Sequence, residues 1–434
     1  MSWNLFRLSS LALAFFVVFS FAKTIPVVHA EENSPPKNKV ILSAPLTFSD
    51  WILRKGSVDE EGVRYVLQQC KNAGLTTIYW RVFDGGLANY HSQFADGFSW
   101  SEIDAGNHFW GPKNPKDLEF TKSIVPNYEA TRENLLERFQ LLEMKDFDTL
   151  EAACKIAREL GISIHVWYTL NEDDHGYGTE TRFAREHPQY LWVKRDGTKY
   201  HSQMSFAYPE VREYKLNVLE ELLEYDIDGV FFDWIRTGDI RDNPQNDAEG
   251  TADYGYEEIN LKEFKEKYGV DPREIPNNDE RWVRYRTLGS TEFMREAHKL
   301  IRAKNPDLVI SAMVHHPWAY RGHLDKINGS LYGLCLDVEI WGNEKLIDAV
   351  VAAGYYLGGG NATLAHEHLK ELTGGKPDVW LYHWIPTTPA DFQNQLNETK
   401  TVGAKQILFW EADYIEGWGN KEEMNQAMGE YAAP

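Results

Sequence analysis

Short apolar runs alternate with amphipathic segments along the chain from residue 39 onward. The run KVILSA (39–44) precedes VDEEGVRYVLQQCKNAG (58–74), which has apolar residues at helical spacing and ends on a glycine, as many helices do. TTIYWRVFD (76–84) is rich in β-branched and aromatic residues, which is typical of a strand. The same alternation continues to the end of the chain, and it predicts repeated strand–helix units.

The pattern predicts eight strands, which centre near residues 40, 77, 164, 230, 311, 351, 381 and 408. Helices are predicted at 58–74, 147–161, 209–225, 280–304, 361–375, 389–403 and 420–432. The segment from 334 to 356 has two interpretations, because a strand at 334–340 also fits it. We prefer a short helix at 337–346 and a strand at 347–356, since LIDAVVAAGYY repeats the form of YDIDGVFFDW, an aspartate before an apolar run.

Eight strand–helix units in one chain predict an α/β protein with a (β/α)8 TIM barrel, and we expect residues 39–434 to form this single domain. An open doubly wound sheet is the alternative. That fold usually has a glycine-rich phosphate-binding turn after its first strand, and SAPLTFSD (43–50) is not such a turn. The long βα inserts after strands two, three and four are expected to form loops around the functional end of the barrel.

The N-terminus has the features of a secretory signal peptide. Arg7 is followed by the apolar run LALAFFVVFSFA, and VHA before Glu31 has the small residues that a cleavage site needs. We therefore expect a signal peptide at 1–30, a polar linker at 31–38 and a secreted or periplasmic protein with no membrane contact after cleavage. An uncleaved membrane anchor is the alternative.

Charge and cysteine content narrow the function further. The formal net charge of −21 argues against nucleic acid and anionic membrane surfaces as partners. The three cysteines, Cys70, Cys154 and Cys335, allow at most one disulfide. Cys70 and Cys154 fall in predicted helices, so buried free thiols are the simpler interpretation. The sequence has neither a P-loop nor a nucleophile elbow, and we expect no cofactor.

The stretch DGVFFDWIR (228–236) places a carboxylate at the end of an apolar strand. Catalytic groups of TIM barrels lie at the C-terminal ends of the strands. Because side chains alternate along a strand, Asp233 shares a face with Gly229 and Phe231. If that face fills the barrel interior, Asp233 lies at the barrel mouth. The structural alternative is that Asp233 pairs with Arg236 or caps the following loop.

A second carboxylate follows the last strand. Glu411 is expected to share a face with Phe409 and Asp413, and Trp410 beside it would supply an apolar setting. Glycoside hydrolysis needs such a pair, in which one carboxyl is a proton donor and the other is a nucleophile or base. We therefore expect Asp233 and Glu411 to be the catalytic pair. Other acidic residues compete, but the cluster at 172–174 is more typical of a solvated loop or a helix cap.

Other side chains at the predicted strand ends suit sugar binding. Flat rings stack on sugars, whereas guanidinium, imidazole and phenol groups form hydrogen bonds with hydroxyls. The candidate stacking residues are Trp80, Trp167, Trp234, Trp384 and Trp410, of which alternation predicts that some face away from the mouth. The candidate polar contacts are Arg81, Arg236, His315, His316, Tyr355 and His383.

The chain also resembles the glycosyl-hydrolase-like family ten proteins, which are secreted. Its segment with the form DG(I/V)xFDxxR, preceded by a helix, is the main similarity, and it covers Asp233 and Arg236. The resemblance spans most of residues 40–415, and it implies a TIM barrel, polysaccharide hydrolysis and an extracytoplasmic location. The stretches that carry it are PEVREYKLNVLEELLEYDIDGVFFDWIR (209–236), HPQYLWVKRDG (187–197) and LDVEIWGNEKLIDAVV (336–351).

The sequence departs from the family pattern in two ways. Trp234 and Thr237 stand where the family commonly has Tyr and Tyr or Asn. Related barrels with an aspartate nucleophile on strand four often take their acid from strand five or six. Here strand five ends in His315 and His316 and strand six in Tyr355 and a second tyrosine, so we look for the acid on strand eight.

The sequence thus predicts a glycoside hydrolase that acts on a neutral or weakly charged polysaccharide. Two alternatives stay open. A barrel that binds carbohydrate without cleaving it would account for the missing acid on strands five and six. A metal-dependent hydrolase would instead use His315, His316 and His383, with Asp233 as a fourth ligand.

Overall fold

The structure is a computed structural model, in which Lys39–Pro434 form one compact unit. It describes residues 39–48, 58–84, 86–95, 147–171, 173, 181–233, 235, 254–277, 279–315, 336–353 and 362–433. The predicted signal peptide and linker lie outside these residues. Within them, no helix combines the length and the apolar character needed to cross a bilayer.

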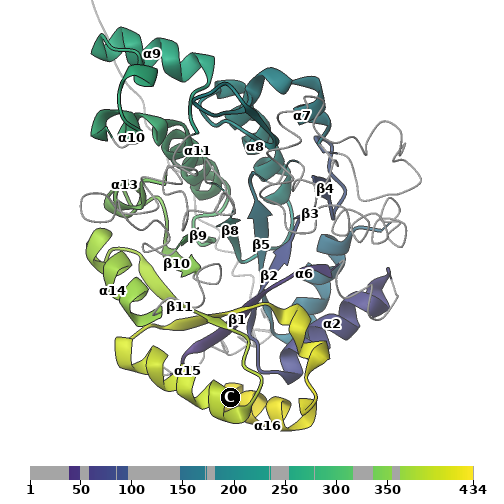
Figure 1. The fold of residues 1–434 in the computed structure, drawn as a ribbon. Coiled ribbons are helices and arrows are strands. Elements are labelled where there is room, and N and C mark those ends of the chain that lie inside the picture. Colours follow the sequence, from purple (N-terminus) through teal and green to yellow (C-terminus); the bar gives the residue numbers. More distant parts are fainter. Residues whose placement is uncertain are drawn as a thin grey trace, which may run out of the picture. The chain divides into compact units, whose positions relative to one another are not determined.

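Eight parallel strands close into a barrel in the order β1-β12-β11-β10-β9-β8-β5-β2 (Figure 1). The strands are β1 (Ile41–Leu46), β2 (Thr77–Arg81), β5 (Ser163–Thr169), β8 (Gly229–Asp233), β9 (Val309–His315), β10 (Ala349–Ala353), β11 (Asp378–Trp384) and β12 (Gln406–Trp410). Each lies where the sequence predicts a strand, so the predicted TIM barrel is confirmed.

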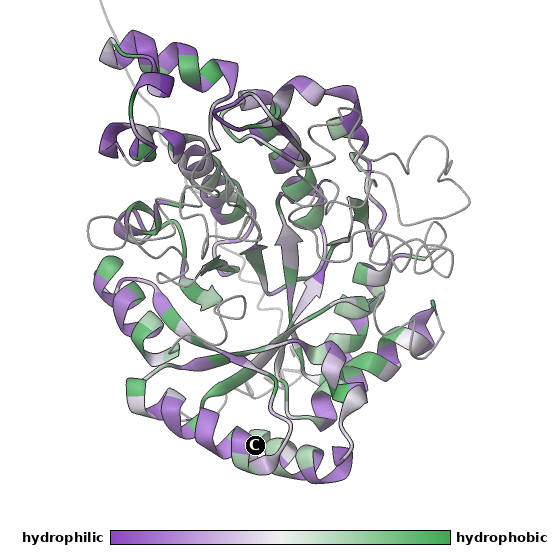
Figure 2. Cartoon of the chain, viewed as in Figure 1, coloured by the Kyte–Doolittle hydropathy of each residue, from purple (hydrophilic) through white to green (hydrophobic). Residues whose placement is uncertain are grey.

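Helices follow the strands and surround the barrel (Figure 1). Along each helix hydrophobic and hydrophilic residues alternate in bands, as expected for helices with one face on a core (Figure 2). They are α2 (Glu60–Asn72), α6 (Thr149–Leu160), α8 (Pro209–Leu222), α11 (Leu288–Lys304), α13 (Val338–Asn343), α14 (Ala362–Leu372), α15 (Pro389–Val402) and α16 (Lys421–Ala432). Cys70 and Cys154 are buried free thiols in α2 and α6, as predicted.

The strands separate two cores. Their inner side chains form a cluster that fills the barrel and includes Tyr79, Trp167, Phe231, Leu408 and Trp410. Their outer side chains pack against the helices in a larger cluster. Because both faces are apolar, these strands are nearly continuous hydrophobic runs, as in other parallel sheets.

Aspartates at the opposite end of the barrel tie neighbouring strands together. Asp228, just before β8, accepts a 2.8 Å hydrogen bond from the backbone N–H of Ile164 in β5 and pairs with Arg158 at 2.6 Å. Asp348, just before β10, bonds β9 in the same way and pairs with Arg302 at 2.6 Å. The repeated pattern of an aspartate before an apolar run is therefore a structural feature of strand starts.

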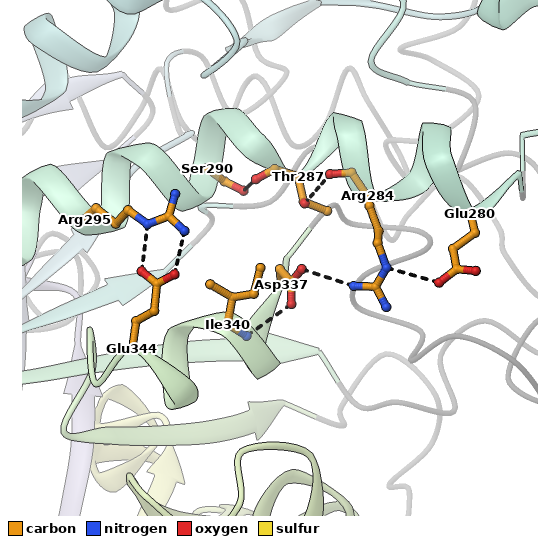
Figure 3. Close-up of polar contacts among 8 residues, drawn as sticks. All are labelled: Glu280, Arg284, Thr287, Ser290, Arg295, Asp337, Ile340 and Glu344. Carbon is orange, nitrogen blue, oxygen red and sulfur yellow. Dashed lines mark hydrogen bonds and ion pairs between the residues drawn. The ribbon is translucent and has the colours of Figure 1, made fainter. Parts of the chain in front are cut away.

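The predicted helix at 280–304 divides at Thr287 into α10 (Glu280–Arg286) and α11. The hydroxyl of Thr287 donates to the carbonyl of Arg284 at 2.7 Å and helps to end α10. On one side of the break, Arg284 of α10 pairs with Asp337 at 3.6 Å. On the other side, Arg295 of α11 pairs with Glu344 at 2.6 Å (Figure 3). Asp337 and Glu344 flank α13, so the two ion pairs connect both helices to it.

Short elements that the sequence pattern did not predict occupy the inserts. The insert after β5 contains α7 (Arg182–Glu186) and a hairpin of β6 (Leu191–Val193) and β7 (Lys199–Met204). The insert after β8 contains α9 (Glu258–Tyr268). The last predicted strand is also shorter than expected, since it ends at Trp410 and a 3-10 helix, η6 (Ala412–Gly417), follows.

Candidate active site

Asp233 lies at the C-terminal end of β8 with its carboxylate almost completely buried, 2% exposed. Its Oδ2 accepts a hydrogen bond of 3.0 Å from the indole Nε1 of Trp167 on the adjacent strand β5. Phe231, two residues earlier, belongs to the cluster inside the barrel. The face of β8 that carries Phe231 and Asp233 therefore turns inward, which is the condition under which the sequence places Asp233 at the barrel mouth.

Trp167 connects Asp233 to the rest of the barrel end. Its ring contacts Trp410 of β12 edge to face, with centroids 5.4 Å apart. The guanidinium of Arg81 lies over the same ring at 5.0 Å, and Arg81 also donates to the hydroxyl of Thr47 at 3.4 Å. The carboxylate is thus held at one side of a set of contacts among β2, β5, β8, β12 and Thr47, the residue after β1.

Glu411 is half-buried and follows β12 directly, after a cis peptide bond from Trp410. The sequence argument placed Glu411 on the face of Phe409, with that face turned inward. The inward orientation was wrong. Phe409 packs outward against Phe392 of α15, with ring centroids 6.5 Å apart, and the inward residue is Trp410. Asp413 is buried in η6, where its Oδ2 accepts from the N–H of Thr47 at 3.5 Å. The pairing of Glu411 with Asp233 stays a prediction.

Two of the predicted sugar contacts face the helices instead of the barrel mouth. Trp80 is fully buried between β2 and α6, and its Nε1 donates to the hydroxyl of Thr149 at 3.3 Å. The Nε2 of His383 lies 3.7 Å from Glu398 of α15, and burial lowers the pKa of this histidine. Alternation explains both corrections, because the inward residues of these strands are their immediate neighbours.

The position of His383 also removes one ligand from the alternative metal site. Among the residues that the structure describes, no cluster of three or more His, Cys, Asp or Glu side chains is arranged to hold a metal ion. Trp234, Arg236, His316 and Tyr355, and the side chain of His315, lie outside the described residues.

Among the predicted rings that the structure describes, Trp384 is the most accessible. It ends β11 with 44% of its surface exposed, whereas Trp167 and Trp410 are only 2% and 7% exposed. Tyr414 in η6 contacts Trp384 and is itself 49% exposed. Sequence reasoning missed Tyr414 because it follows the end of the strand, where alternation no longer indicates direction.

Asp173, in the loop after β5, is part of a buried ion pair. Its Oδ1 lies 2.7 Å from the ammonium of Lys215 on α8 and accepts from the hydroxyl of Thr181 at 3.1 Å. The side chains of Asp173 and Lys215 are 0% and 5% exposed, and burial raises the pKa of Asp173. The expected solvated loop is thus wrong at this residue, which instead fastens the loop after β5 to α8.

Comparison with known proteins agrees with this arrangement. The sequence model of the family described as glycosyl hydrolase-like 10 matches residues 122–373. The chain belongs to this family. The resemblance found in the sequence is therefore confirmed, and the matched residues include Asp233. A search of curated proteins gave no match.

Solved structures of glycoside hydrolases share the fold of this family member. They include the PgaB (BpsB) glycoside hydrolase domain of Bordetella bronchiseptica, with 11% identity and a TM-score of 0.55 over 91% of this chain and 99% of that one. The β-amylase catalytic domain of Paenibacillus polymyxa has 10% identity and a TM-score of 0.56 over 91% and 99%. The endo-1,4-β-mannanase of Rhizomucor miehei has 10% identity and a TM-score of 0.51 over 91% and 94%.

Proposed function

We propose that the protein is a secreted glycoside hydrolase that cleaves O-glycosidic bonds in a neutral or weakly charged poly- or oligosaccharide. The observation that carries the proposal is the carboxylate of Asp233, buried at the C-terminal end of β8 and bonded to Trp167 at 3.0 Å. In TIM barrels this end of the strands holds the active site. The family match and the glycosidase neighbours in fold support a sugar substrate.

The position of Asp233 suggests its role. It ends β8, the fourth strand of the barrel along the chain, where related barrels carry an aspartate nucleophile, and the hydrogen bond from Trp167 helps to orient its carboxylate. We therefore assign Asp233 as the nucleophile or base. In the retaining version, Asp233 attacks the anomeric carbon while Glu411 gives its proton to the departing glycosidic oxygen. Glu411 then takes a proton from water, whose oxygen displaces Asp233 and completes the hydrolysis.

Glu411 is the proposed acid because of its place beside β12. It follows Trp410, whose ring contacts the Trp167 that bonds Asp233. The two carboxyls of glycosidases lie roughly 5 to 9.5 Å apart, with the shorter separations in retaining enzymes and the longer ones in inverting enzymes. The anomeric configuration of the first product, followed by NMR, distinguishes these two outcomes.

The test is release of reducing sugar from a broad panel of polysaccharides and oligosaccharides. Asp233→Asn and Glu411→Gln should each lower the rate by at least about 10²-fold, as is typical when an acid or base is removed. Glu416→Gln is the matched control, because this carboxylate lies in η6, five residues after Glu411, and bonds Tyr65 and Lys421. Its rate should stay close to that of the wild type.

Each result has a clear meaning. Sugar release that persists in Asp233→Asn would reject the assigned role of this residue. Binding of a polysaccharide by the wild type without any release would favour the non-catalytic carbohydrate-binding barrel. Export is tested separately, by N-terminal analysis of protein recovered outside the cytoplasm, which should begin at Glu31.

A further inference from the structure

Two large aromatic side chains lie exposed where β11 and β12 end. Trp384 is 44% exposed and Tyr414 is 49% exposed. Their ring centroids are 6.4 Å apart and their planes meet at 67°. We call this pair the aromatic corner. Exposed rings in contact leave apolar surface in water, and such surface on a folded protein often marks a binding site.

The backbone on both sides of the corner is fixed. The carbonyl of Trp384 accepts a 3.1 Å hydrogen bond from the side chain of Gln395 on α15. The next residue, Ile385, donates to the carbonyl of Trp410 at 3.0 Å, and Tyr414 donates to the carbonyl of Glu411 at 3.3 Å. The two rings are therefore attached to neighbouring strand ends, and a ligand would not have to order the backbone that carries them.

The geometry of the corner selects a type of ligand. A pyranose has one face of C–H groups and a rim of hydroxyls. The C–H face can lie flat on the indole of Trp384 while the steeply inclined ring of Tyr414 contacts its edge. Flat, rigid aromatic side chains supply a large contact area at a small cost in conformational entropy. A neutral sugar fits better than an anionic one, because Glu411 lies three residues before Tyr414 in a chain of net charge −21.

We propose that the aromatic corner is a pyranose-stacking subsite that holds one neutral sugar unit beside Glu411. This proposal rests on the proposed glycosidase function for its ligand class. It adds the position at which the substrate docks, and it adds Tyr414 as a binding residue. A second copy of this chain is the other partner that could cover an exposed aromatic pair. The experiment below distinguishes sugar binding from self-association.

Binding is measured by calorimetry in Asp233→Asn, so that turnover cannot consume the ligand. The probes are the neutral hexasaccharides cellohexaose, mannohexaose and maltohexaose. Trp384→Ala should weaken binding of at least one probe by about 10-fold, which corresponds to about 1.4 kcal/mol, and Tyr414→Ala should also weaken it. Trp384→Phe should retain most of the affinity, because a flat ring remains.

Leu364→Ala is the control for loss of exposed apolar surface, since this residue on α14 is 46% exposed and should not affect binding. Circular dichroism checks that each variant is folded, and Tyr414→Ala tests the corner independently if Trp384→Ala does not fold. The proposal is overturned if no probe binds, if both alanine variants bind like the parent, or if Trp384→Ala instead abolishes self-association in light scattering.

The outcomes separate this proposal from the proposed function. Affinity that depends on Trp384, in a wild-type protein that releases no sugar, would leave the subsite standing and remove the glycosidase. Sugar release with the same KM in the wild type and in Trp384→Ala would remove the subsite and leave the glycosidase.

Discussion

Trp167 and Asp233 come from neighbouring strands, and the indole N–H of Trp167 donates a hydrogen bond of 3.0 Å to the carboxylate. Both side chains are 2% exposed, so water does not replace this donor easily. The same indole lies under Arg81 and against Trp410. The bond therefore helps to fix the orientation of the Asp233 carboxylate.

Trp167→Phe should reduce activity strongly while the aromatic packing is largely kept. A hydrogen bond to a charged group contributes about 1.5 to 3 kcal/mol, so kcat should fall by about 10- to 100-fold. Trp80→Phe is the matched control, because Trp80 is also buried and its indole also donates a hydrogen bond, at 3.3 Å to Thr149, but outside the barrel. Steady-state kinetics on both variants measure the loss of kcat, and urea unfolding measures any loss of stability. Equal losses of kcat in Trp167→Phe and Trp80→Phe would contradict a specific role for Trp167.

The barrel itself was predictable from the sequence, because buried parallel strands produce apolar runs separated by amphipathic helices. The sequence also shows that Asp233 shares a face with Gly229 and Phe231. Which face of β8 turns inward was not predictable, and neither was the orientation of Trp80 and His383. In a strand with two apolar faces nothing in the pattern identifies the inner one, and an error of one residue reverses every side chain.

Other parts of the site depend on contacts that lie far apart in the chain. Asp173 looks like a loop residue until Lys215, on another element, is placed 2.7 Å from it. Glu411 and Tyr414 follow the end of β12, where a 3-10 helix replaces the strand and the alternation argument stops. Local patterns therefore identify the strand ends but do not fully identify which side chains meet there.

Lys215→Met should destabilise the fold by about 3 to 5 kcal/mol, because it leaves the buried carboxylate of Asp173 without its cation. Adding Asp173→Asn should recover much of this loss, since the unpaired charge is then gone. Lys405→Met is the control, because Lys405 and its partner Asp378 are 72% and 48% exposed and such pairs contribute at most about 1 kcal/mol. Urea unfolding measures all three variants, and similar values for Lys215→Met and Lys405→Met would show that the buried pair contributes no more than an exposed one.

Glu257 should make the stability of the protein depend on pH. Its carboxylate is fully buried at the start of α9, where it accepts hydrogen bonds from the N–H of Val193 at 3.1 Å and from the side chain of Asn260 at 3.0 Å. Burial raises the pKa of Glu257 from 4.5 to about 7. The folded protein therefore keeps a proton that the unfolded chain has already lost between these two values.

The stability that this group contributes is present below about pH 4.5 and is lost as the pH rises toward 7, by roughly 3 kcal/mol at most. Glu257→Gln carries no titratable group, so the wild type should lose stability relative to this variant between pH 5 and pH 7.5 and show no further relative change above that. His165, whose pKa burial lowers to about 4, acts in the opposite direction, but it is present in both proteins and cancels in the difference. Urea unfolding of the pair at several pH values measures this difference, and a constant value between pH 5 and 8 would contradict the raised pKa of Glu257.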